Sequence, residues 1–152
     1  MTRERRLDLL GTLLRLVLGG VLLVAGALKV TNLGASALAV RAYQLLPYDL
    51  AGYVGYALPV VEIIVGLLLI LGLFTRAAAV LGGLLMLAFV IGICWAWAKG
   101  LSIDCGCFGG GGEISSGRTA YPLDFARDLV LLLAAGWLVR RPATAYALDA
   151  RL

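Results

Sequence analysis

The chain has 152 residues, of which 62% are hydrophobic and only 14% are charged, with a net charge of +4. Its mean hydropathy of +0.98 is far above that of soluble globular domains, so a water-soluble fold is excluded. The arginines cluster at segment ends instead of forming a stripe, which excludes a nucleic-acid partner. The chain has no histidine, the commonest metal ligand and general base. We therefore expect a single domain, residues 1–152, whose main partner is the lipid bilayer.

The apolar segments predict an all-α polytopic membrane protein, a bundle of four transmembrane helices. Each segment is long enough to cross about 30 Å of hydrocarbon at about 1.5 Å per residue, and lipid favours helices because it offers no partner for free backbone groups. The predicted helices are 9–30, 50–74, 77–98 and 122–139, with outer loops at 31–49 and 99–121. The basic start of the first helix resembles a signal peptide, but Arg15 interrupts its apolar run, so we expect a retained helix.

The basic residues also predict an orientation, because loops on the cytoplasmic side are enriched in Lys and Arg. With the N-terminus inside, the inner side holds Arg3, Arg5, Arg6, Arg76, Arg140, Arg141 and Arg151, and the outer side holds Lys29, Arg41, Lys99 and Arg118. We expect both termini in the cytoplasm of a bacterial cell and the last outer loop on the extracytoplasmic side of the inner membrane. That side is oxidising, so two neighbouring cysteines there can form a disulfide.

Residues 102–113, SIDCGCFGGGGE, place Cys105 and Cys107 in a polar, glycine-rich loop. As a structural staple the pair is weak, because closing three residues is worth only about 1.6 kcal/mol in the chain-entropy estimate. A bond from Cys94 to either cysteine would close about a dozen residues, worth about 3 kcal/mol. A zinc site needs four ligands, and the chain has three cysteines and no histidine, so we predict no metal. A P-loop is excluded, because no Lys-Ser or Lys-Thr follows the glycines.

The third interpretation is a redox-active dithiol. A small strained ring is easily reduced, which makes its disulfide a good oxidant. Gly106 gives the ring backbone freedom, and the glycines that follow leave room for a partner's thiolate. The neighbouring Asp104 counts against it, because a carboxylate raises the pKa of a thiol. From the residues alone, the redox dithiol and the staple both remain open.

The order of these features resembles the MauE/DoxX-like family of redox-associated membrane proteins. The resemblance covers nearly the whole chain and is carried by RLVLGGVLLVAGALKV, YQLLP, PVVEIIVGLLLILGLFTRAAA, DCGCFG and DFARDLVLLL. It implies a four-helix membrane bundle with a redox pair at Cys105 and Cys107, and with Phe108 and Gly109 as motif partners. The MauE branch of the family is associated with maturation of methylamine dehydrogenase, a periplasmic enzyme rich in disulfides. Cys94 is outside the motif, as a possible third thiol.

Several charged residues fall within the predicted helices. Glu62 lies near the bilayer midplane, where a carboxylate costs at least a few kcal/mol unless it is paired or protonated. We expect its partner to be Arg15 or Arg127, the latter flanked by Asp124 and Asp128, whereas Lys29 and Asp8 are expected to be anchors at helix ends. These charges either fix the order of the helices or form a proton path, or a polar end for a quinone, near the dithiol. The helix glycines, at 19, 20, 26, 66, 72, 82 and 83, are expected at close helix contacts.

The function predicted from the sequence is a membrane-embedded thiol–disulfide redox protein. It would pass electrons to or from a thioredoxin-like protein or a periplasmic client, with a quinone as a possible cofactor. The alternative is a non-catalytic membrane scaffold or assembly factor whose loop holds a structural disulfide. A small-solute transporter built around Glu62 is disfavoured, because the paired broken helices typical of such sites are missing.

Overall fold

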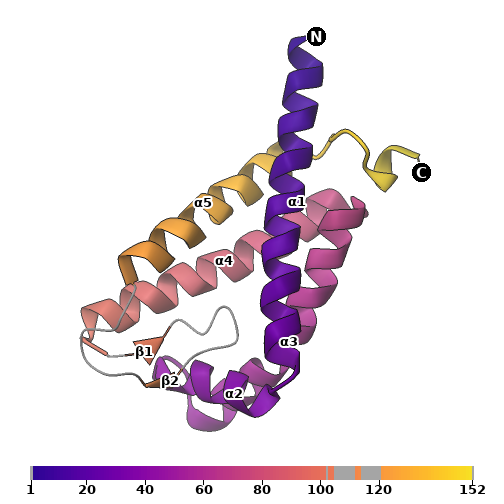
Figure 1. The fold of residues 1–152 in the computed structure, drawn as a ribbon. Coiled ribbons are helices and arrows are strands. Elements are labelled where there is room, and N and C mark those ends of the chain that lie inside the picture. Colours follow the sequence, from indigo (N-terminus) through magenta and orange to yellow (C-terminus); the bar gives the residue numbers. More distant parts are fainter. Residues whose placement is uncertain (1, 102, 105–111, 114–120, 152) are drawn as a thin grey trace.

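The computed structural model describes residues 2–101, 103–104, 112–113 and 121–151. Within them the chain forms five α-helices, two short strands and a 3-10 helix (Figure 1). The elements are α1 (Arg3–Val30), α2 (Leu33–Ala42), α3 (Tyr48–Leu71), α4 (Thr75–Ala98), β1 (Ile103–Asp104), β2 (Gly112–Glu113), α5 (Tyr121–Arg140) and η1 (Leu148–Arg151). Both termini lie at one end of the bundle, and α2 and the strands lie at the other (Figure 1).

Helices α1 and α3 pack with their backbones in direct contact. A Cβ added to Gly19 would lie 2.9 Å from the Gly66 carbonyl oxygen, and one added to Gly66 would lie 2.7 Å from the Leu23 nitrogen. Nearer the strands, a Cβ on Gly26 would lie 2.7 Å from the Pro59 carbonyl oxygen. The expected close contacts are confirmed at these three glycines. Gly20 was predicted wrongly, because nothing lies within 4 Å of the position of its Cβ.

Large apolar side chains cover the outside of the bundle, and alanines, glycines and a few charged groups fill much of its inside. Leu13, Ile64 and Leu84 are exposed, for example, whereas Ala78, Ala79 and Ala135 are buried. Among the described residues, α1, α3 and α4 are long and apolar enough to cross a membrane. This arrangement fits a helical bundle in lipid and confirms the predicted fold class.

The fourth predicted helix, 122–139, is present as α5 and runs beside α4 (Figure 1). Its first two turns carry Asp124, Arg127 and Asp128, so composition alone does not mark it as a membrane span. That α5 crosses the bilayer as a fourth span therefore stays a prediction.

The predicted outer loop 31–49 was wrong in one respect, because it contains a helix, α2. Ten residues are too few to span a membrane, and this length led to its assignment as a loop. The Asn32 side chain caps the helix by accepting a hydrogen bond from the Ala35 nitrogen at 3.1 Å. Ala37 and Ala39 are buried, so α2 packs against the bundle at the end opposite the termini.

A three-residue turn joins α3 to α4 at the end where the termini lie. Gly72 ends α3 in the left-handed conformation with φ 72°, and a Cβ there would overlap Arg15 and Ala147. Phe74 also has a positive φ, of 47°, and its side chain does not cap α4. The short break expected between the helices 50–74 and 77–98 is present, but it lies at residues 72–74 instead of 75–76.

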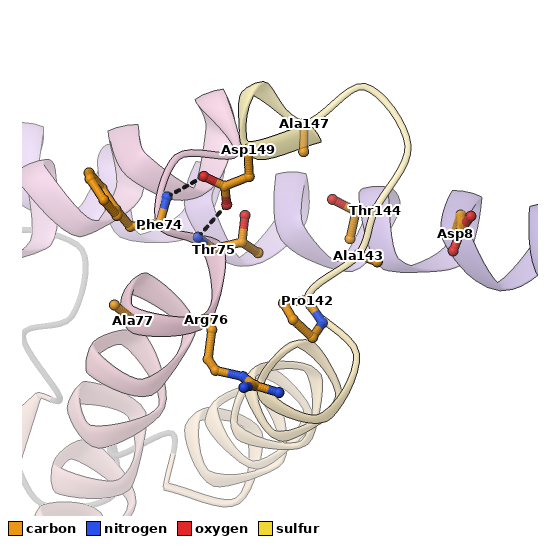
Figure 2. A pocket seen from close by; sticks show the side chains of 10 residues that line it. All are labelled: Asp8, Phe74, Thr75, Arg76, Ala77, Pro142, Ala143, Thr144, Ala147 and Asp149. Atoms are coloured by element: carbon orange, nitrogen blue, oxygen red, sulfur yellow. Dashed lines mark hydrogen bonds between the residues drawn. The ribbon is translucent and has the colours of Figure 1, made fainter. Parts of the chain in front are cut away.

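The C-terminal segment supplies the missing cap (Figure 2). The Asp149 carboxylate accepts hydrogen bonds from the Phe74 and Thr75 nitrogens, both at 2.8 Å. The Asp149 nitrogen donates to the Gly72 carbonyl oxygen at 3.0 Å. Burial raises the pKa of Asp149, but the hydrogen bonds from Thr75 and Phe74 outweigh it, so this pKa lies below its ordinary value. Asp149 thus fastens the chain end to the α3–α4 turn, beside an open recess of about 930 Å³.

Replacing Asp149 with Ala should remove this cap and lower the stability by about 1 kcal/mol, the usual cost of losing an N-terminal cap. Asp49→Ala, at an exposed carboxylate in the first turn of α3, is the matched control and should change stability little. Because folding lowers the pKa of Asp149, its stabilisation should be complete above the ordinary value of 3.8 and disappear as the pH falls below it. Thermal unfolding of both variants between pH 3 and 7 measures this; equal losses at all pH values would contradict it.

Candidate functional site

A buried ion pair joins α1 to α3 inside the bundle. The Lys29 Nζ lies 2.8 Å from Glu62 Oε1 and 3.1 Å from Oε2. The side chains are only 4% and 0% exposed. The Lys29 ammonium also lies 5.2 Å from the centre of the Phe89 ring on α4, a distance at which a cation is attracted to an aromatic face. The pair therefore links three helices.

The direction of helical side chains explains why Lys29 reaches Glu62. Lys29 is the next-to-last residue of α1, and side chains on a helix lean toward its N-terminus. The long Lys29 side chain therefore extends back into the bundle instead of out toward the interface. Gly26, one turn earlier on α1, allows the approach, because a Cβ there would lie 3.0 Å from the Glu62 Cβ.

The pairing of Glu62 is as predicted, but both predicted partners were wrong. Arg15 lies 14 residues from Lys29 on the same helix, roughly 21 Å along its axis, and its Nη2 donates to the Ala145 carbonyl oxygen at 3.5 Å. Its Nε and Nη1 are buried without a hydrogen-bond partner among the described residues. Lys29, expected to be an interfacial anchor, is the true partner.

Arg127 pairs with carboxylates of its own helix. Its Nε lies 2.9 Å from Asp128 Oδ1, and its Nη1 lies 3.3 Å from Asp124 Oδ1. Asp128 is only 2% exposed, and it also interacts electrostatically with Lys29. The predicted polar positions Glu62, Arg127 and Asp128 thus belong to one charged region across α1, α3 and α5, whereas Arg15 lies at the other end of the bundle.

A proline on α3 fixes the position of α2 over this region. Pro59 has no N–H, so the carbonyl of Gly55, four residues earlier, loses its helical donor. The Ser36 hydroxyl on α2 donates to that carbonyl at 2.7 Å. A Cβ on Gly55 would overlap the backbone of Ala37, so only glycine lets α2 approach so closely. Pro59 therefore frees a carbonyl of α3 that binds α2.

The predicted redox residues Cys105 and Cys107, with Gly106, Phe108 and Gly109, lie outside the described residues. The strands on either side of them are described. β1 ends at Asp104, immediately before Cys105, and pairs antiparallel with β2, with Ile103 opposite Glu113. The ribbon lies at the end of the bundle opposite the termini, next to α2 (Figure 1). Cys94, the one cysteine in the described part, is an exposed free thiol on α4, which does not support the staple from Cys94.

The sequence matches the family described as methylamine utilisation protein MauE over residues 7–141. The chain belongs to the MauE family. Comparison with curated proteins and with solved structures gave no match. The family match and the long apolar helices together show that this chain is a membrane protein associated with methylamine utilisation. The C-terminal segment that carries Asp149 lies beyond the matched residues.

Removing one partner of the ion pair should destabilise this MauE protein strongly. Glu62→Gln leaves the Lys29 ammonium buried without a counter-charge, which costs about 3–5 kcal/mol. The double variant Lys29→Met, Glu62→Gln removes both charges and should recover most of that loss. Unfolding in detergent, with Asp49→Asn as an exposed acid-to-amide control, measures both effects. A Glu62→Gln protein as stable as this control would show that the pair contributes nothing to the fold.

Proposed function

We propose that this MauE protein is a thiol–disulfide redox protein of the membrane, with Cys105 and Cys107 as its reactive pair. It would exchange electrons with a thioredoxin-like protein or with a client such as methylamine dehydrogenase during its maturation. The observation that carries the proposal is the position of the β1–β2 ribbon. It holds Asp104 opposite Gly112, so both ends of the segment containing the cysteines are fixed at the end of the bundle away from the termini.

Three further facts support the proposal. The ribbon packs against α2, and α2 is anchored on α3 through the Ser36–Gly55 hydrogen bond. A reactive pair on such a support is presented to a soluble partner and is kept out of the lipid. A ring of three residues gives little stability as a staple, about 1.6 kcal/mol, so its chemistry is the better reason for its presence. The family name, which refers to methylamine utilisation, fits a client enzyme rich in disulfides.

The reaction would follow ordinary thiol–disulfide exchange. A thiolate of the partner attacks one sulfur of the Cys105–Cys107 disulfide, the other sulfur leaves as a thiolate, and a mixed disulfide forms. The partner's second thiolate then attacks that mixed disulfide, which leaves the partner oxidised and both cysteines reduced. In the reverse direction the reduced pair attacks a disulfide of the partner, and we assign that first attack to Cys107, because Asp104 adjoins Cys105 and a neighbouring carboxylate raises the pKa of a thiol.

Serine variants test the redox assignment. The double variant Cys105→Ser, Cys107→Ser should stay folded and lose at most about 1–2 kcal/mol, because the ring closes so few residues. The wild-type disulfide should equilibrate with glutathione well above about −300 mV, below which structural disulfides lie. A single serine variant should accumulate a mixed disulfide with its partner, since the resolving thiol is missing. Cys94→Ser is the matched control and should trap nothing. If the double variant unfolds, or the disulfide resists glutathione, the stapled scaffold is the better description.

Labelling in intact cells tests the proposed orientation, with the ribbon outside and both termini in the cytoplasm. After mild reduction, a membrane-impermeant maleimide should label Cys105 or Cys107. Cys94 should stay unlabelled, because it is exposed on α4 four residues before the helix ends and there faces lipid, not water. Single-cysteine variants, read by a mass shift on gels, separate the three. Labelling of the loop only after the membrane is opened would reverse the orientation.

A further inference from the structure

A cavity of about 360 Å³ lies between α2, α3 and α4. This volume is at the small end of the range for ligand sites, about 300–1,000 Å³, and suits a single ring better than a whole lipid. Its walls are mostly apolar, and Lys29 is the charged residue that lines it. Such walls with one well-placed polar group are typical of sites that orient a small molecule.

The cavity opens toward the lipid. Leu45, Leu46, Val54 and Ile91 line it and are also exposed on the surface of the molecule. Apolar side chains at the mouth of a cavity in a membrane bundle face hydrocarbon, so a ligand would enter from the bilayer. The occupant is therefore a membrane-soluble molecule.

The groups inside the cavity define its chemistry further. An ammonium has three donors, and Lys29 uses two on the Glu62 oxygens, which leaves one N–H without an acceptor among the described residues. The rings of Phe89 and Tyr43 also line the cavity, and the Tyr43 ring lies against the backbone of Gly92. A flat ring with a carbonyl oxygen would pack on these aromatic side chains and accept the remaining hydrogen bond.

The cavity is also connected to the ribbon. Tyr43 and Phe89 pack in one apolar cluster with Leu101, three residues beyond the end of α4. Asp104, the last residue before Cys105, follows Leu101 by three residues and thus lies within about 11 Å of it. A ligand in the cavity is therefore close to β1, whose last residue precedes Cys105 in the sequence.

We propose that this cavity binds the ring of a lipid-soluble quinone, with Lys29 donating a hydrogen bond to a ring carbonyl. The electron transfer rests on the function proposed above, whereas the binding does not. Oxidation of the two thiols to a disulfide releases two electrons and two protons, and the quinone takes up both to become a quinol. The quinone would then reoxidise the pair after each client is oxidised.

Equilibrium binding of decylubiquinone to the full-length protein in lipid nanodiscs tests the site. Ala88 lines the mouth of the cavity and is exposed, so Ala88→Phe should obstruct the cavity without loss of folding and weaken binding at least tenfold. Ala126→Phe makes the same change at an exposed alanine of α5 outside the cavity and should bind as the wild type does. Absence of saturable binding, or equal binding by both variants, would overturn the proposal.

Two further measurements separate the proposed site from the proposed reaction. Decylbenzene, which has the ring and the tail but no carbonyl, should bind at least tenfold more weakly; equal binding would identify a site for apolar tails and refute the quinone. The Cys105→Ser, Cys107→Ser variant should bind decylubiquinone normally but fail to reduce it. If the reduced wild type binds decylubiquinone normally but does not reduce it, the quinone site stands and the dithiol function is refuted. Disulfide exchange by the wild type without binding of decylubiquinone would refute the quinone site and leave the dithiol function standing.

Discussion

The Lys29–Glu62 ion pair is the constraint on which the half of this protein away from the termini depends. Two charges in the interior of a membrane bundle are tolerated only if they contact each other closely. That contact requires α1 and α3 to touch, and the glycines at 19, 26 and 66 allow their backbones to do so. The pair then determines the register of the two helices, because sliding one helix by a single residue would separate Lys29 from Glu62. Packing and electrostatics therefore select the same arrangement.

A second polar contact in the same half of the bundle is the hydrogen bond from Ser36 to the Gly55 carbonyl. Lipid cannot satisfy the carbonyl that Pro59 leaves free, so a donor from another element has to do so. The hydroxyl of Ser36 brings α2 across α3, and α2 in turn supports the strands that flank the cysteines. Pro59, in the middle of α3, thus helps to position the strands that flank the proposed redox pair.

The sequence predicted the parts of the structure that rest on long apolar runs. The long apolar helices and a buried, paired Glu62 followed from segment length and from the cost of a buried charge. The break between α3 and α4 was predicted at residues 75–76, and it lies at 72–74. Two features were missed because local patterns do not encode them. Lys29 appeared to be an interfacial anchor because it lies at the end of α1. Its side chain, however, points toward the N-terminus of the helix and so into the bundle. Helix α2 appeared to be a loop, because its stability comes from docking on Gly55 and not from its length. Asp124 and Asp128 were recognised as neighbours of Arg127, since that pairing is local to α5.

The balance of charge in the site bears on what can bind there. Counted as ionised, Lys29 and Arg127 supply two positive charges, and Glu62, Asp124 and Asp128 supply three negative ones. The region therefore carries a net charge of −1, and it would repel an anionic substrate. A net negative charge would also give no help in forming a thiolate on the proposed redox pair. An uncharged molecule with a hydrogen-bond acceptor meets no such repulsion, and Lys29 offers it a donor that Glu62 holds in place.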